Sequence, residues 1–200
     1  FGLAITEPAE LARQLTAPFQ TEKARARVIF SWVAKHIRYD CEKFRRPGKP
    51  VQFTGATAEE IQQKSEQWEA NQIRQTLRKK KGVCEDYSRL FKALCEAAGL
   101  EAVVITGWGR PFYQPFSKLS KKPNHAWNAV KIDGQWRLAD VTWAAGYTDR
   151  PVKKFTAYFQ PGYFLTPPER FVEDHLPLEE KWQLTPCLVS REDFMRRAYS

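Results

Sequence analysis

The sequence predicts an α+β fold in which helices occupy the first half of the chain and antiparallel strands follow. Two segments before residue 100 repeat apolar residues every three or four positions, which is the spacing of an amphipathic helix. After residue 100, β-branched runs and alternating patterns dominate, and the pair Asp133-Gly134 separates two of them. The 200 residues are 42% hydrophobic, enough to bury one substantial core, so we expect a single domain over residues 1–200.

The first predicted helix runs from Thr21 to Asp40. Thr21 is a suitable N-cap, and Glu22 places a carboxylate in the first turn, where the helix dipole favours negative charge. The expected buried stripe consists of Val28, Ile29, Trp32, Val33 and Ile37. His36 lies near the helix end, where we interpret it as a structural residue.

Residues 41–75 hold a loop and part of a polar helix, and we allow this segment to be an insertion. Residues 41–57 mix Pro, Gly and basic side chains as loops do, and a polar helical stretch spans residues 58–81. The stretch ends in four cations at positions 78–81, which we interpret as a solvated helix end rather than a targeting or nucleic-acid signal. These cations come just before Cys84, and positive charge favours a thiolate.

The next predicted helix spans residues 83–98 and begins beside a cysteine. Its apolar face consists of positions 83, 87, 90, 91, 94, 95 and 98. Gly99 is the expected left-handed residue after the helix, and Gly82 permits a tight turn before it. Cys84 therefore lies at the helix N-terminus, where unpaired N–H groups stabilise an anion. The two carboxylates that follow it oppose this effect, so Cys84 is a candidate nucleophile only if a base lies nearby.

A candidate base comes from the strand-rich half. Residues 101–108 predict a core strand, and Asp133-Gly134 predicts a type I′ hairpin turn within residues 125–143. Counting outward from this turn places Trp127 opposite Asp140 and His125 opposite Thr142. These four side chains then share one face, and the Cβ atoms of His125 and Asp140 lie within about 8 Å of each other. An imidazole oriented by a carboxylate, near a helix that presents a cysteine, is the arrangement of a catalytic triad.

Each member of this group also has a structural interpretation. Taken alone, His125 would be a hydrogen-bonded core histidine and Asp140 a turn former at a strand end. Their combination with Cys84 favours the catalytic interpretation.

Three ordered motifs resemble the transglutaminase-like superfamily of papain-like cysteine enzymes: IRYD, GVCEDYSRLFKALCEAAGL and HAWNAVKIDGQWRLADVTWAAG. Residues 163–184 are similar to the C-terminal segment of kyphoscoliosis peptidase-like proteins. The resemblance implies a papain-like core in which a nucleophile-bearing helix packs on an antiparallel β-sheet. It also implies Cys84 as nucleophile, His125 as base and Asp140 as the orienting carboxylate. Asp86 departs from the pattern, where a glycine is expected, which puts the local charge and pocket shape in question.

Two aromatic residues are further candidates for substrate contact. Tyr39 belongs to the IRYD motif, and Trp127 shares the face of His125, although both also fit packing roles. We interpret His175 as structural, because it belongs to a Pro-rich tail, residues 151–200, that we expect to pack on the core.

The composition and motifs limit the classes of partner, metal and cofactor that we expect. A net charge of +9 favours acidic protein or peptide partners, although an ordinary basic surface would give the same value. No helix-turn-helix, RNP-type or zinc-finger pattern is present, so we expect no nucleic-acid partner. Three histidines and four scattered cysteines give no metal or disulfide framework, and no acidic loop suggests calcium, so we expect neither metal nor cofactor.

Compartment and membrane association follow from other features. No apolar run reaches membrane-spanning length. The sequence begins at Phe1 rather than Met, so we expect a processed or trimmed chain. The compartment stays open, with an extracellular or periplasmic location allowed if a signal peptide was removed.

The predicted function is thiol-dependent acyl transfer on protein or peptide amides. Water as acceptor gives a cysteine protease or amidase, and an amine gives a cross-linking transglutaminase. We favour water, because no calcium signature and no second substrate motif are present. A protein-interaction module that keeps the fold with little turnover is the remaining alternative.

Overall fold

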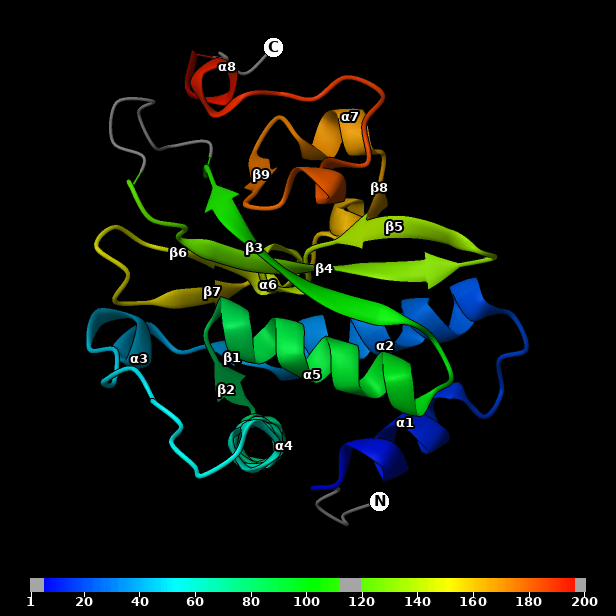
Figure 1. The fold of residues 1–200 in the computed structure, drawn as a ribbon. Coiled ribbons are helices and arrows are strands. Elements are labelled where there is room, and N and C mark those ends of the chain that lie inside the picture. Colours follow the sequence, from blue (N-terminus) through cyan, green and yellow to red (C-terminus); the bar gives the residue numbers. More distant parts are fainter. Residues whose placement is uncertain (1–5, 112–119, 197–200) are drawn as a thin grey trace.

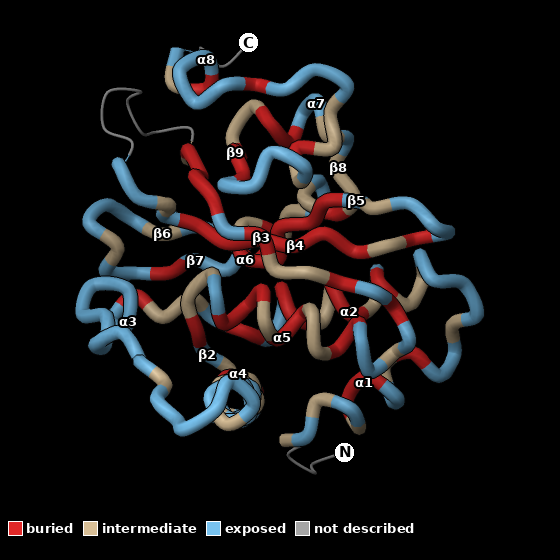
Figure 2. The backbone as a smooth tube through the Cα atoms, viewed as in Figure 1, coloured by how far each residue is buried: buried red, intermediate tan, exposed pale blue. Residues whose placement is uncertain are grey.

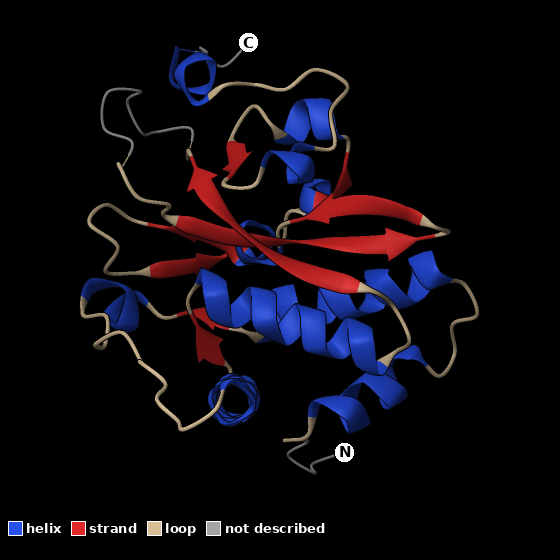
Figure 3. Cartoon of the chain, viewed as in Figure 1, coloured by secondary structure: helices blue, strands red, loops and turns tan. Residues whose placement is uncertain are grey.

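The computed structural model describes residues 6–111 and 120–196, and it shows an α+β fold with a central antiparallel sheet (Figures 1 and 3). The sheet has five strands in the order β8-β5-β4-β3-β9. These are β3 (Ala102–Gly109), β4 (His125–Ile132), β5 (Gln135–Ala139), β8 (Phe164–Thr166) and β9 (His175–Pro177). Two small sheets accompany it, a parallel pair of β1 (Arg38–Tyr39) with β2 (Lys81–Gly82) and an antiparallel pair of β6 (Gly146–Thr148) with β7 (Phe155–Ala157).

Helices cover the face of the sheet that carries the main core. Helix α5 (Cys84–Ala97) packs on β3 and β4, and α2 (Glu22–His36), α1 (Pro8–Thr16) and α4 (Ala58–Lys79) pack against α5 (Figure 1). Buried residues concentrate where α2 and α5 face the sheet (Figure 2). The shorter helices are α3 (Cys41–Arg45), α6 (Val141–Ala145), α7 (Pro168–Phe171) and α8 (Arg191–Arg196), with 3-10 turns η2 (Pro161–Tyr163) and η3 (Glu180–Gln183). The predicted fold, a cysteine-bearing helix on an antiparallel sheet, is confirmed.

Local signals in the sequence account for several of these boundaries. The side chain of Thr21 caps α2 by accepting a hydrogen bond from the Ala24 N–H at 3.2 Å. Asp133 and Gly134 have φ values of 50° and 76°, as a type I′ turn requires, and Ile132 pairs with Gln135 across it. Gly99 follows α5 with a φ of 79°.

The helix predicted from Thr21 to Asp40 is too long at its C-terminal end. α2 ends at His36, and the backbone at Ile37 is extended because β1 pairs with β2 instead of continuing the helix. The prediction of an uninterrupted loop from residue 41 is also wrong. Asp40 accepts a hydrogen bond from the Lys43 N–H at 2.9 Å and thereby caps the short helix α3. His36 bonds the Trp32 carbonyl through Nδ1 at 2.8 Å, as a helix-end structural residue would.

The Pro-rich segment after residue 150 contributes strands to the sheet. β8 pairs with β5 at one edge, and β9 pairs with β3 at the other. The assignment of residues 1–200 to one domain, with an insertion at 41–75, stays a prediction. Among the described helices, none is long and apolar enough to cross a membrane.

Candidate active site

Cys84 is the first residue of α5, and the turn around it is closed by Asp86. The buried Asp86 carboxylate accepts a hydrogen bond from the Val83 N–H at 2.8 Å. The ammonium of Lys43 donates to both oxygens of this carboxylate, at 2.7 and 2.9 Å. A Cβ at Gly82 would lie 2.5 Å from the Cβ of Asp86, so this position requires glycine. Asp86, the departure from the expected glycine, therefore has a structural role in the first turn, with its charge balanced by Lys43.

Hydrogen bonds anchor α5 at the level of Cys84, which is half-buried. The Ser88 hydroxyl donates to the Cys84 carbonyl at 2.9 Å, and the Asn128 amide donates to the Ser88 carbonyl at 3.0 Å from β4. The Tyr87 hydroxyl donates to the carbonyl of Ile37, just after α2, at 2.7 Å. The helix start is thus held against both the sheet and the neighbouring helix.

His125 and Asp140 meet as the hairpin count indicates, but by a different local route. His125 Nε2 lies 2.6 Å from Asp140 Oδ2. The predicted pairing of His125 with Thr142 is wrong, because β5 ends at Ala139 and α6 begins at residue 141. Asp140 Oδ1 accepts a hydrogen bond from the Trp143 N–H at 3.0 Å, so Asp140 is the N-cap of α6. The capped turn breaks the strand and leaves Oδ2 for the imidazole.

His125 and Asp140 each shift the pKa of the other strongly. Burial lowers the pKa of His125, but the charge of Asp140, the hydrogen bond to it and a hydrogen bond with Cys84 outweigh burial and raise the pKa to about 10. Burial raises the pKa of Asp140, but the charges and hydrogen bonds of the histidines outweigh burial and hold this pKa well below its usual range. Both effects favour an imidazolium–carboxylate pair inside the protein. Cys84, the candidate nucleophile, lies close enough to His125 to contribute to this raised pKa.

A second histidine, missed as a site residue in the sequence, shares the same carboxylate. His175 is 1% exposed, and its Nε2 lies 2.9 Å from Asp140 Oδ2. Its Nδ1 lies 2.5 Å from Asp174 Oδ1. A carboxylate faces each ring nitrogen and carboxylates accept, so this arrangement favours a proton on both nitrogens and a positive charge on His175. Burial works against this charge, but Asp174 and Asp140 outweigh burial and raise the pKa of His175.

Backbone pairing delivers His175 to this position. Gly109 on β3 pairs with His175 on β9, and the Arg110 N–H donates to the Asp174 carbonyl at 2.8 Å. A Cβ at Gly109 would lie 2.9 Å from Cδ2 of His125, so glycine makes room for the His125 imidazole. The Trp143 ring stacks on His125 with centroids 5.0 Å apart, and its centroid lies 4.4 Å from that of His175. One indole therefore covers both histidines.

The two further aromatic candidates lie in different places. Trp127 is 1% exposed and packs against both His125 and His175, with ring centroids at 5.9 and 5.0 Å. Such burial favours the packing role that the sequence also allowed. Tyr39 is half-buried on β1, pairs with Gly82, and lines a pocket beside β2.

The described part of the chain has one grouping of metal-ligand type, formed by His125, Asp140 and His175. Their ligand atoms lie within 4.8 Å of one another. Both Nε2 atoms point at the same carboxylate oxygen over hydrogen-bond lengths, which is the arrangement of two donors on one acceptor. The chemistry of the grouping is therefore proton sharing.

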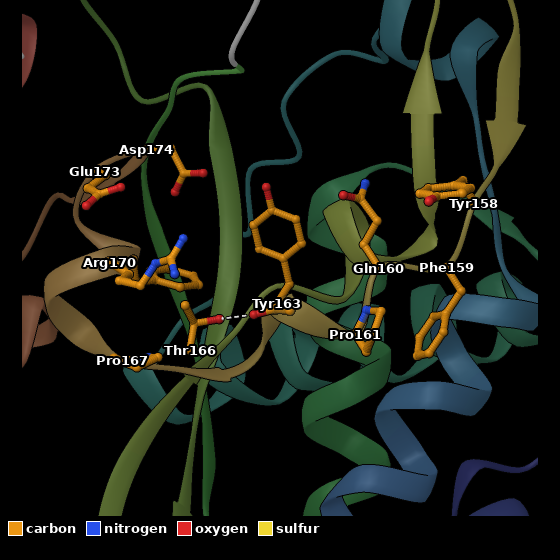
Figure 4. Close-up of a pocket in the computed structure, with 12 residues that line it drawn as sticks. Tyr158, Phe159, Gln160, Pro161, Tyr163, Thr166, Pro167, Arg170, Glu173 and Asp174 are labelled. Carbon is orange, nitrogen blue, oxygen red and sulfur yellow. Dashed lines mark hydrogen bonds between the residues drawn. The ribbon is translucent and has the colours of Figure 1, made fainter. Parts of the chain in front are cut away.

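A hollow of about 560 Å³ adjoins the His175 side of this cluster. Figure 4 shows the Tyr163 ring projecting between Gln160 on one side and Arg170 and Asp174 on the other. The hollow reaches the cluster through Asp174, the partner of His175, and its lining does not include Cys84 or His125.

The comparisons with known proteins agree with one another. Residues 9–141 match the family model described as the transglutaminase-like superfamily. Kyphoscoliosis peptidase of Mus musculus is 34% identical over 195 residues, which cover 95% of this chain and 26% of that protein. Hillarin of Drosophila melanogaster is 30% identical over 203 residues, covering 92% of this chain and 22% of that protein. The chain thus spans about a quarter of the length of these relatives.

Similarity to solved structures is more distant. A crystal structure of a TGase matches with 18% sequence identity and a TM-score of 0.45, covering 74% of this chain and 33% of that chain.

Proposed function

The chain belongs to the transglutaminase-like superfamily, and on that premise we propose that it is a thiol-dependent acyl-transfer enzyme acting on protein or peptide amides. The observation that carries the proposal is the 2.6 Å contact between His125 Nε2 and Asp140 Oδ2, in a histidine whose pKa the neighbouring Cys84 also helps to raise. A cysteine at a helix N-terminus, a base and an orienting carboxylate are the parts that nucleophilic catalysis by a thiol needs.

In the first half of the reaction, the Cys84 sulfur attacks the amide carbon. The thiol proton passes to His125, which holds it as the imidazolium of the pair with Asp140, and the C–S bond forms as the carbonyl π electrons move onto oxygen. The backbone N–H of Cys84, in the first turn of α5, is one donor to the resulting oxyanion, because first-turn N–H groups have no partner within the helix. When the C–N bond breaks, the imidazolium gives its proton to the leaving amine and a thioester remains.

In the second half, an acceptor attacks the thioester. With water, His125 removes a proton from it, the C–S bond breaks and a carboxylic acid leaves, so the reaction is hydrolysis. With a primary amine, the same steps give a new amide and the reaction is transamidation. We propose hydrolysis, and the name of the Mus musculus relative, a peptidase, supports this choice.

Asp140 holds His125 in the tautomer that places a proton on Nε2 and directs Nδ1 toward the thiol. His175 acts in this proposal as a positioning residue, since it contacts Asp140 and not the reacting atoms. Its positive charge stabilises the Asp140 carboxylate but disfavours a second cation on His125. His125 consequently gives up its proton to the leaving amine more readily than it would beside Asp140 alone.

Two parallel assays test the function. One measures new N-termini released from a protein mixture, and the other measures incorporation of a labelled primary amine into glutamine-bearing protein. We expect new N-termini that disappear in Cys84→Ala. Amine incorporation without cleavage, dependent on Cys84, would replace the hydrolase by a cross-linking enzyme. Silence in both assays, with a protein partner whose binding survives Cys84→Ala, would indicate the interaction module.

A further inference from the structure

A pocket of about 560 Å³ beside β2 is lined mainly by cations. They come from four parts of the chain: β1, α3, the junction of α4 with β2, and the loop before β7 (Figure 1). The seven basic residues are Arg38, Arg45, Lys79, Lys80, Lys81, Lys153 and Lys154. We refer to this hollow as the basic pocket.

Nearby carboxylates do not balance this charge. Glu42 lines the pocket, Asp40 pairs with Lys81 at 3.2 Å, and Asp149 accepts hydrogen bonds from the backbone of the two lysines before β7. Seven cations against three carboxylates leave an excess of four positive charges in one hollow. Exposed lysines elsewhere in the described chain often have a carboxylate partner of their own, as Lys64 and Lys181 do.

A solvated helix end does not account for the pocket. The dipole of α4 favours Lys79 and Lys80 at its C-terminus, but Arg38, Arg45 and the pair before β7 belong to other elements. Lys80 adopts a left-handed backbone with φ of 52°, and its ammonium sits 4.4 Å from the centroid of the Trp32 ring. Such a conformation is uncommon for lysine, and here it turns the chain from α4 into β2. Cations from distant segments are thereby gathered around one space.

The pocket lies close to the candidate nucleophile. Lys81 precedes Cys84 by three residues, so their Cα atoms are at most about 11 Å apart. An extended peptide advances about 3.3 Å per residue. A substrate whose amide reaches Cys84 and whose chain runs past Lys81 can therefore place side chains about three to five residues away at the basic pocket.

From this placement we propose that the basic pocket binds anionic side chains of the protein substrate, three to five residues from the amide that Cys84 attacks. The inference rests on the proposed function and assigns its substrate class: polypeptides with clustered carboxylate or phosphate groups. Carboxylates and phosphates share the chemistry that lysine and arginine recognise, and the pocket accepts either.

Binding of labelled peptides to Cys84→Ala tests this without turnover. The probes are a fluorescent peptide with a run of glutamates, the same peptide with phosphoserines, and a charge-reversed peptide with lysines. We expect the two acidic peptides to bind and the lysine peptide not to bind. Lys153→Gln with Lys154→Gln should weaken acidic-peptide binding about tenfold, and added salt should weaken it further. Tighter binding of the phosphopeptide than of the glutamate peptide would identify phosphate as the preferred group.

The matched control is Lys23→Gln with Lys181→Gln, which removes the same charge from two exposed lysines outside the pocket. A change of less than about twofold is expected there, since long-range charge is screened. Equal losses of acidic-peptide affinity in both double variants would refute the basic pocket as the binding site and would attribute binding to the net charge of the protein. A single-stranded oligonucleotide that binds more tightly than the acidic peptides, with the same lysine dependence, would also overturn it.

The two proposals fail differently. Acidic-peptide binding that depends on the pocket, without any Cys84-dependent product in either assay, would refute the enzyme and keep the binding site. Cleavage that is unaffected by acidic residues in the substrate and by the Lys153 and Lys154 substitutions would refute the role of the basic pocket but would support the proposed enzyme activity.

Discussion

Replacing His175 by glutamine tests the second histidine on Asp140, because glutamine keeps an N–H donor but carries no charge. The ring centroids of His125 and His175 are 5.5 Å apart. Two unit charges at that distance repel by about 3 kcal/mol at an effective dielectric constant of about 20, which corresponds to about two pKa units. Since Asp140 bonds both rings and absorbs part of the repulsion, we expect the pKa of His125 to rise by about one to two units in His175→Gln.

The assay is ¹⁵N NMR of the imidazole rings in a Cys84→Ala background, where the Cys84 side chain makes no contribution to the pKa of His125. The chain has three histidines, so each ring is assigned by a single substitution. At a pH where His125 of the Cys84→Ala parent has lost its second proton, the ring should still be doubly protonated in His175→Gln. Asp174→Asn is the companion variant, because it keeps His175 and removes the carboxylate at Nδ1. It should lower the pKa of His175.

An unchanged His125 titration in folded His175→Gln would refute the electrostatic role of His175. A His175 ring with one unprotonated nitrogen at pH 7 in the parent would refute its assignment as a cation. Asp174 is 21% exposed, so Asp174→Asn still tests the charge of His175 if glutamine in the buried cluster unfolds the protein.

Three further predictions concern the surroundings of the site. Brief iodoacetamide treatment, mapped by mass spectrometry, should label Cys84 well before Cys95, because Cys95 is fully buried and burial raises its pKa. Equal labelling of the two thiols in the folded protein would contradict an activated Cys84. Asp86→Ala should lower the free energy of unfolding by about 1–2 kcal/mol, because it removes the partner of the Val83 N–H and of Lys43. The control Glu85→Ala should lower it by less than about 0.5 kcal/mol. Equal losses in urea unfolding would refute the capping role of Asp86. The pKa values of His125 and His175 in the folded protein lie above 6.5, so above that pH folded Cys84→Ala holds more protons than the unfolded chain. Its unfolding free energy should therefore fall by about 2 kcal/mol between pH 6.5 and 8. No decline, or the same decline in His125→Gln, would contradict the raised pKa values.

Elements governed by local chemistry were predictable from the sequence. The Thr21 cap, the Asp133-Gly134 turn and the glycine after α5 each rest on side-chain or φ preferences that act over a few residues. The hairpin register follows from the turn, and Lys131 accordingly pairs with Trp136 across it. The cysteine-bearing helix and the meeting of His125 with Asp140 could be anticipated on the same basis.

Features that depend on distant partners could not be anticipated. The carboxylate of Asp140 caps α6 as well as bonding His125, and no strand count detects a competing helix cap. His175 belongs to a three-residue strand whose register is set by β3, 66 positions earlier at Gly109. A short Pro-flanked segment carries no periodicity that would place it on a sheet edge. The signal that was available is the pair Asp174-His175, an acidic residue beside a histidine.

The most direct measurement of the central claim is intact-mass spectrometry of the protein quenched with acid during turnover of the p-nitrophenyl ester of an N-blocked acidic peptide. The account predicts a mass increase equal to the acyl part of the substrate, located on Cys84 by peptide mapping and removed by hydroxylamine as a thioester is. The adduct should be absent in Cys84→Ala and should form far more slowly in His125→Gln. Turnover that persists in Cys84→Ala, or an acyl adduct that maps to Cys41 or Cys187 instead, would contradict the account.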